Sequence, residues 1–117
     1  MKKILVLGVG AQGSAAAKRL DKEPKVEEII CADYDMKAVE SVVASITKGK
    51  GVFVDAHDRQ SIIDAAQGVD LILNGLPLEC TENVLEAALA VKANYQDYAG
   101  TTELYNMWME SDLGKIP

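Results

Sequence analysis

The sequence predicts an α/β domain built on a doubly wound parallel sheet. Short apolar runs alternate with helical patterns along all 117 residues, which is typical of successive βαβ units. A chain of this length has room for one core. We therefore expect one domain, with about five strands in the order 3-2-1-4-5, helices on both faces, and ligands at the carboxyl ends of the strands.

The strands are predicted from aliphatic or β-branched runs that end at Gly, Asp or Asn. They are Lys3–Gly8, Glu28–Asp33, Val52–Asp55, Asp70–Asn74 and Asn94–Tyr98. Alternation in the last of them suits a partly exposed edge strand. Its Tyr95 and Asp97 are equally compatible with a place beside a substrate.

Helices are predicted between the strands from their periodicity, alanine content and capping residues. They are Ala11–Lys22, Met36–Thr47, Arg59–Ala66, Thr81–Val91 and Thr102–Ser111. Asp35, Asp58 and Thr81 are the expected N-caps. Trp108 on the last helix is either apolar cover for the sheet or part of a surface for a further domain.

Composition and charge exclude several classes of protein. No segment approaches the roughly 20 apolar residues that span a bilayer, so we expect a cytoplasmic protein without a membrane partner. A net charge of −6 and a pI near 4.7 argue against nucleic acid, which is bound by clustered Lys and Arg. Cys31, Cys80 and His57 form no metal-ligand spacing, so neither a disulfide nor a metal site is expected.

The most informative segment is a G-x-G-x-x-G motif between the first strand and the first helix. Gly8 permits a tight turn, Gly10 lets the backbone approach a pyrophosphate, and Gly13 allows the helix to pack closely on the strand. The helix then begins at Ala11 and Gln12. Its N–H groups and dipole favour a negative charge by roughly 0.3–1 kcal/mol.

Asp33 completes the Rossmann fingerprint. It ends the second strand about 20 residues after the glycine motif, where a carboxylate accepts hydrogen bonds from the adenosine ribose. The pattern predicts a nicotinamide-dinucleotide site, with Tyr34 next to Asp33. A 2′-phosphate would be repelled by Asp33, with Asp35 nearby, by about 1 to 4 kcal/mol depending on the dielectric. NAD is therefore favoured over NADP, although Lys37 could swing in and weaken the preference.

The loop after the third strand is expected beside the adenine. Asp55 and Ala56 are the candidate contacts. His57 and Asp58 follow, and a solvated His57 with Asp58 as a helix cap explains this segment as well as a catalytic His57 does.

The loop after the fourth strand is expected beside the nicotinamide half of the dinucleotide. Asn74, Gly75, Leu76 and Pro77 are the candidate contacts to the ribose and ring, and Pro77 forces the backbone to turn. Cys80 either approaches the substrate or is an incidental thiol near a helix start.

With these loops in place, the chain resembles the N-terminal domain of the saccharopine dehydrogenase family. The resemblance is carried by Ile4–Gly13, Ala32–Asp33, Val54–Ala56, Asp70–Pro77 and Asn94–Ala99. It implies reversible hydride transfer between a nicotinamide ring and the carbon of an amino-acid-derived imine or secondary amine. It also implies that Gly8, Gly10, Gln12 and Gly13 hold the pyrophosphate, Asp33 the ribose, Asp55 and Ala56 the adenine side, and Leu76 and Pro77 the nicotinamide side.

Family members continue into a substrate domain. The resemblance therefore implies that this chain is the cofactor half of an NAD(P)-dependent oxidoreductase, inactive alone, with the amino-acid-derived substrate and the catalytic residues in a further domain. A homodimer of the full-length protein is left open. The alternative is a regulatory NAD(H)-sensing domain of the potassium-transporter type, which shares the glycine motif and the acidic second-strand end; fold alone does not separate the two.

Overall fold

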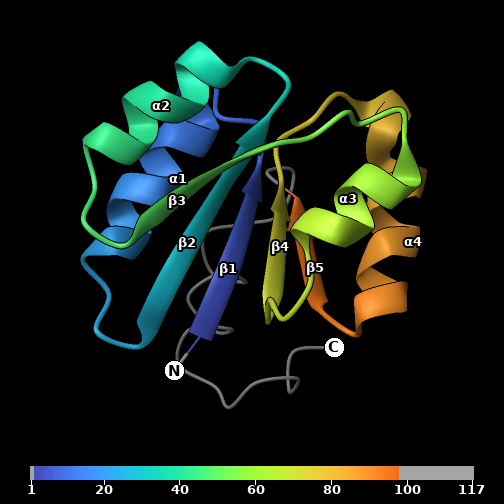
Figure 1. Ribbon diagram of the computed structural model, residues 1–117. Coiled ribbons are helices and arrows are strands. Elements are labelled where there is room, and N and C mark those ends of the chain that lie inside the picture. Colours follow the sequence, from blue (N-terminus) through green and yellow to red (C-terminus); the bar gives the residue numbers. More distant parts are fainter. Residues whose placement is uncertain (1, 98–117) are drawn as a thin grey trace.

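A five-stranded parallel sheet with helices on both faces forms the domain (Figure 1). The computed structural model describes residues 2–97. The strands lie in the order β3-β2-β1-β4-β5, and each neighbouring pair is parallel. This is the predicted order. The expected helix Thr102–Ser111, with Trp108, and the end of the last strand at Tyr98 lie outside the described residues.

The strands are β1 (Lys2–Leu7), β2 (Val26–Asp33), β3 (Gly49–Phe53), β4 (Leu71–Asn74) and β5 (Asn94–Asp97). The helices are α1 (Ala11–Asp21), α2 (Met36–Ala44), α3 (Arg59–Ala65) and α4 (Thr81–Val91), with a 3-10 turn, η1 (Leu78–Cys80), before α4. The sequence therefore predicts the five strands and the four α-helices at their places, and most of their described boundaries lie within one residue of the prediction.

The predicted third strand, Val52–Asp55, is placed too late. β3 begins at Gly49 and ends at Phe53, so Asp55 belongs to the following loop. The start of β3 carries no β-branched pattern, because tight packing beneath α2 selects glycine there. A Cβ on Gly51 would lie 2.7 Å from Cγ1 of Val39.

Two of the three predicted N-caps are confirmed. The Asp35 carboxylate accepts hydrogen bonds from the N–H groups of Lys37 and Ala38, and Asp58 accepts one from Gln60. Thr81 is wrong as a cap, because η1 runs directly into α4 and makes Cys80 the N-cap residue. Local turn geometry has overridden the ordinary preference for a hydroxyl at this position.

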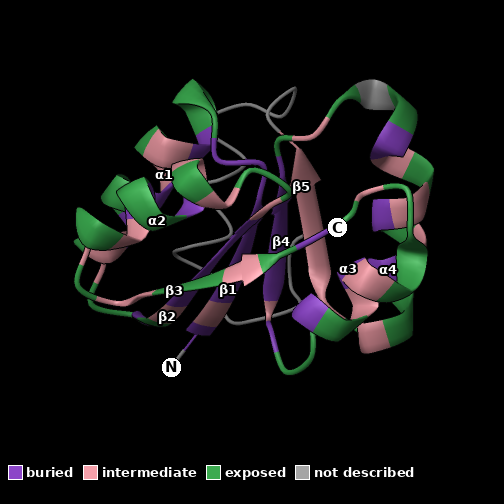
Figure 2. Cartoon of the chain, turned by 45° about the horizontal axis from the view of Figure 1, so that its top comes forward, coloured by how far each residue is buried: buried purple, intermediate pink, exposed green. Residues whose placement is uncertain are grey.

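The core is divided between the two faces of the sheet. On one face, Ile4 and Val6 of β1 pack with residues of α1 and α2 such as Leu20. On the other, Leu5 and Leu7 pack with residues of α3 and α4. β1 is buried on both faces (Figure 2), and each such side chain contributes about 1.5–3 kcal/mol. Because β1 is packed on both faces, it holds the loop that follows it at the carboxyl edge of the sheet.

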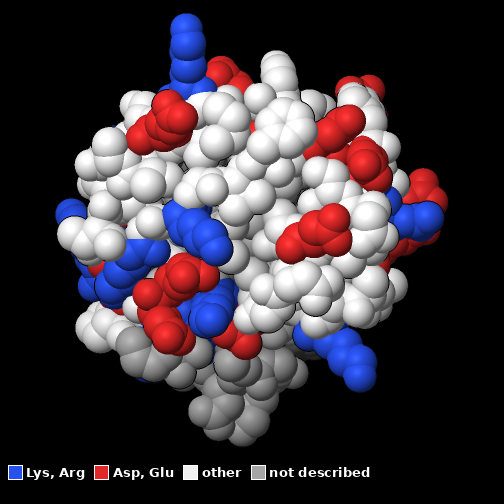
Figure 3. All heavy atoms as spheres, in the orientation of Figure 1, with Lys and Arg blue, Asp and Glu red and all other residues white. Residues whose placement is uncertain are grey.

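None of the described helices combines the length and the apolar character that a bilayer crossing needs. Basic and acidic side chains lie interspersed on the face of the molecule shown in Figure 3.

Asp21, the last residue of α1, ties that helix to the segment before β3. Its carboxylate accepts hydrogen bonds from the N–H groups of Thr47 (3.0 Å) and Lys48 (2.9 Å) and from the Thr47 hydroxyl (3.1 Å). Partial burial alone raises the pKa of Asp21, but these hydrogen bonds and the nearby Lys48 charge outweigh it. The pKa therefore lies below the ordinary value of 3.8.

We expect Asp21→Asn to lower the free energy of unfolding by about 1 kcal/mol near neutral pH. A carboxylate whose pKa is lowered by folding stabilises the protein above its unfolded pKa of 3.8, and this stability is lost as the pH falls through the folded pKa. Urea unfolding along a falling pH series should show the wild type approaching the variant below that value. A difference that stays constant across the series would contradict this account.

Candidate functional site

The loops after β1, β2 and β4 meet at one edge of the sheet. Leu7 pairs with Ala32 on one side and with Asn74 on the other. Just beyond these pairs, the N–H of Gly8 donates a hydrogen bond to the carbonyl of Ala32 (2.8 Å). The N–H of Gly75 likewise donates to the carbonyl of Leu7 (2.7 Å). The glycine motif, the end of β2 and the turn after β4 are thus neighbours in space.

Two glycines of the motif are required by close packing. Gly8 has a φ of +85°, and a Cβ there would lie 3.0 Å from the carbonyl carbon and oxygen of Gly75. A Cβ on Gly13 would lie 1.9 Å from the carbonyl oxygen of Gly8. Gly10 differs, because a Cβ there would meet nothing within 4 Å. Gly10 therefore borders open space at the start of α1.

The N-terminus of α1 is chemically suited to an anion. Gly10 is its N-cap residue, no side chain of the described part caps the first turn, and that turn holds no acidic residue. Ala11 and Gln12, the first two helical residues, are exposed. Uncapped N–H groups at a helix start, together with the helix dipole, bind phosphate groups well.

The Asp33 carboxylate anchors the glycine loop to the end of β2. One of its oxygens accepts a hydrogen bond from the N–H of Val9 (3.0 Å), and the other accepts one from the N–H of Asp35 (3.1 Å). An ionised carboxylate has about four acceptor sites, so capacity remains for ribose hydroxyls. Tyr34 beside it is 77% exposed. The Asp33 carboxylate can therefore accept further hydrogen bonds at this edge.

Asn74 is a buried polar residue that braces the turn after β4. Its Oδ1 accepts a hydrogen bond from the N–H of Leu76 (3.0 Å), and its Nδ2 donates to the hydroxyl of Tyr95 (3.1 Å). Leu76 is half-buried, while Gly75 and Pro77 are exposed. The turn therefore presents Gly75 and Pro77 outward, and the Asn74 side chain is engaged inside the protein.

Tyr95 and Asp97 lie on β5, the edge strand of the described sheet. The Tyr95 hydroxyl donates to Oδ2 of Asp97 (3.4 Å). Burial, with the charge of Asp97, raises the pKa of Tyr95 against the opposing hydrogen bond from Asn74. Tyr95 therefore stays protonated at neutral pH and acts here as a hydrogen-bonding link between two strands.

The loop after β3 is pinned at several points. The N–H of Asp55 donates to the Ser61 hydroxyl (3.1 Å), and Oδ1 of Asp55 accepts from the N–H of His57 (3.0 Å). Nδ2 of Asn83, on α4, donates to the carbonyl of Ala56 (3.1 Å). No motif points to Asn83, because its partner is a backbone carbonyl far along the chain. The loop is therefore fixed against α4.

A polar groove of about 570 Å³ lies between this loop and α4. An ion pair between Arg59 and Glu86 joins the start of α3 to the middle of α4 there. The groove is lined by His57, Asp58, Arg59, Gln60, Glu82, Asn83 and Glu86. None of these lining residues belongs to the glycine motif, so the groove is separate from the start of α1.

Both cysteines are buried thiols. Burial raises the pKa of Cys31, in the core, to about 11. Burial, with the charges of Glu79 and Asp55, also raises the pKa of Cys80. Neither side chain has the lowered pKa of an activated nucleophile.

Comparison with known proteins identifies the family. The family described as "Saccharopine dehydrogenase NADP binding domain" matches residues 4–115. The meso-2,3-butanediol dehydrogenase of Serratia marcescens is 28% identical over 98 residues, which cover 75% of this chain and 38% of that protein.

Solved structures show the same fold at low identity. The saccharopine dehydrogenase (L-Glu forming) of Saccharomyces cerevisiae has a TM-score of 0.77 at 15% identity, over 92% of this chain and 24% of that one. A NAD⁺-bound xylitol dehydrogenase has a TM-score of 0.66 at 19% identity, over 82% of this chain and 52% of that one. The chain thus spans about half or less of these relatives. By its match from residue 4 to residue 115, it belongs to the family of saccharopine dehydrogenase NADP-binding domains.

Proposed function

We propose that this domain holds a nicotinamide dinucleotide across the carboxyl edge of its sheet and presents it to the substrate of an oxidoreductase. The observation that carries the proposal is the uncapped start of α1 beside Gly10, where a Cβ would meet only open space. The pyrophosphate lies there, against the backbone of Gly8, Gly10, Ala11, Gln12 and Gly13.

The two ends of the dinucleotide lie on either side of the glycine motif. Asp33 accepts hydrogen bonds from the adenosine ribose, with Tyr34, Asp55 and Ala56 on the adenine side. The nicotinamide side is formed by Gly75, Leu76 and Pro77. Asn74 holds this turn in place, because its Oδ1 accepts a hydrogen bond from the N–H of Leu76. When bound, the cofactor supplies the hydride chemistry. The residues of this chain bind it, orient it and set the local charge.

The substrate of the whole protein is an amino-acid-derived imine or secondary amine, bound by a further domain that also carries the catalytic residues. The family match supports this reading, and the similar yeast enzyme is described as L-Glu forming. The same match favours an oxidoreductase over a nucleotide-sensing regulatory domain. The cytoplasm is the location that we propose for the enzyme. Residues 1–117 form the cofactor domain in this proposal.

The domain prefers NAD to NADP in this proposal, although the family description names NADP. The Asp33 carboxylate, held in place by the Val9 N–H, faces the position of a 2′-phosphate and repels it. We expect the wild type to bind NADH at least about tenfold more tightly than NADPH. Asp33→Asn, which keeps an acceptor for the loop but loses the charge, should narrow that ratio to within about threefold.

Calorimetric titration with NADH and NADPH measures both affinities. Asp35→Asn is the matched control, because it removes the same charge two residues away while asparagine keeps the N-cap of α2. It should leave the ratio close to that of the wild type. Tighter binding of NADPH by the wild type, or an unchanged ratio in Asp33→Asn, would contradict the preference and leave dinucleotide binding itself intact.

A further inference from the structure

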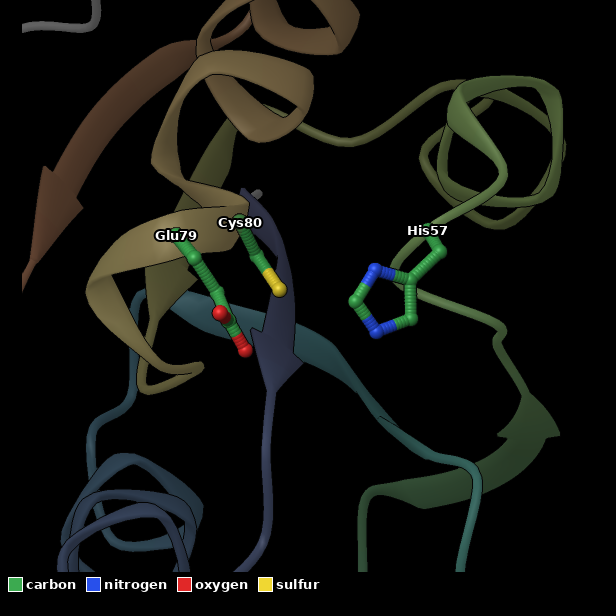
Figure 4. Close-up of side chains that lie close together, drawn as sticks. All are labelled: His57, Glu79 and Cys80. Atoms are coloured by element: carbon green, nitrogen blue, oxygen red, sulfur yellow. The ribbon is translucent and has the colours of Figure 1, made fainter.

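Three side chains with metal-binding groups lie together on two loops that are far apart in the sequence. They are His57, in the loop before α3, and Glu79 and Cys80, in the turn before α4. One ring nitrogen, one carboxylate oxygen and the sulfur all lie within 4.8 Å of one another. Figure 4 shows the three groups directed toward the same space between the loops. We propose that they form a binding site for a divalent transition-metal ion, for which Zn²⁺ is the best fit.

The donor set selects the metal. Imidazole nitrogen, carboxylate oxygen and thiolate sulfur are the usual ligands of Zn²⁺, at about 2.0–2.3 Å. A thiolate and an imidazole together disfavour Mg²⁺ and Ca²⁺, which prefer oxygen. Three protein ligands leave the fourth tetrahedral position for water or another small ligand.

The distances are close to those that coordination requires. Ligand atoms around a tetrahedral Zn²⁺ are roughly 3.3–3.8 Å apart, given those bond lengths. Because the three ligand atoms all lie within 4.8 Å of one another, coordination requires them to approach by at most about 1.5 Å. His57 and Glu79 are exposed and can rotate, whereas Cys80 is buried and fixes one corner of the site.

The protein already holds the two loops at this separation. Nδ2 of Asn83, in the first turn of α4, donates to the carbonyl of Ala56 (3.1 Å), one residue before His57. The N–H of Cys80 donates to the carbonyl of Pro77 (2.9 Å) and shapes the turn that carries Glu79 and Cys80. The loops are therefore ordered before any ion binds, which lowers the entropic cost of coordination.

Charge and access also favour a cation. The polar groove begins at His57 and runs along α4, and the exposed His57 and Glu79 side chains give an ion access to the site from solvent. Asp58, Glu82 and Glu86 line that groove against a single cation, Arg59. The metal site lies beside the edge proposed for the dinucleotide, but it uses no residue of the glycine motif. The metal proposal is therefore independent of the proposed function.

Cobalt titration of the full chain, stripped of metal and kept reduced, tests this site. Co²⁺ replaces Zn²⁺ in such sites, and coordination by a thiolate gives an intense near-ultraviolet charge-transfer band. We expect that band to saturate at one equivalent and to disappear when Zn²⁺ is added. Cys80→Ser should abolish it. Cys31→Ser, which removes the one other thiol of the sequence, should leave it unchanged.

The other two ligands are tested by affinity. His57→Ala and Glu79→Gln should each weaken Co²⁺ binding at least about tenfold, while Glu82→Gln, the same charge change on a groove residue outside the cluster, should alter it less than twofold. Because His57 and Glu79 are exposed, their variants should remain folded even if Cys80→Ser does not. A wild type without the band, or a band that survives Cys80→Ser, would overturn the proposal. So would equal affinities of the Glu79 and Glu82 variants. None of these measurements depends on NADH binding.

Discussion

Replacing Gly13 by alanine is expected to lower the free energy of unfolding by more than about 3 kcal/mol, at the upper end of the usual range for overpacking. The added Cβ would lie 1.9 Å from the carbonyl oxygen and 2.9 Å from the carbonyl carbon of Gly8. These are backbone atoms, so no side-chain rotation relieves the contact. Relief requires α1 to move away from β1, which disturbs the core around Leu20.

Urea unfolding followed by circular dichroism measures this effect. Gly10→Ala is the matched control, since its Cβ would meet nothing within 4 Å and its φ of −68° suits alanine. The control should lose no more than about 1 kcal/mol, the cost of alanine in place of glycine at an N-cap. Equal stabilities of Gly13→Ala and the wild type would show that the motif does not pack as described.

The same control variant is expected to have the largest effect on binding. Gly10→Ala should weaken NADH binding at least about tenfold, or 1.4 kcal/mol, while the domain remains folded. The reason is that its methyl group projects into the open space where the pyrophosphate approaches the backbone. Nicotinamide fluorescence on addition of the protein measures the affinity.

Gly68→Ala is expected to lower stability without weakening NADH binding, the reverse of the effect of Gly10→Ala. Gly68 lies between α3 and β4, away from the glycine motif, with a φ of +77° and open space around its Cβ position. Alanine there costs about 1–2 kcal/mol of stability through backbone strain and should leave NADH affinity unchanged. Loss of affinity in Gly68→Ala as large as in Gly10→Ala would attribute the effect to general loosening of the fold.

The order of the strands could be predicted because periodicity and the handedness of crossovers are properties of the chain itself. The sequence places β3 too late because Gly49 and Gly51, near the start of the strand, carry no side-chain pattern. Both glycines pair with β2. Because they have no side chains, α2 can pack closely against this part of the strand. The local sequence shows the two glycines, but it does not show that α2 packs against them.

The sequence likewise predicts some features of the candidate site and not others. The glycine motif and Asp33 follow a spacing rule, so the sequence indicates them. The sequence does not predict the hydrogen bond from the Val9 N–H to the Asp33 carboxylate, because this bond depends on how two loops approach each other. His57 and Cys80 match no metal-ligand spacing. Their proximity follows from the packing of α3 against α4 and from the Asn83 contact.

Calorimetric titration of the wild-type chain with NADH is the decisive test of dinucleotide binding at the start of α1. We expect saturable binding of one NADH per chain, tighter than binding of NADPH under the same conditions. Absence of any saturable heat with either dinucleotide, even at millimolar concentrations, would contradict the proposed site and reduce the conclusion to a statement about fold.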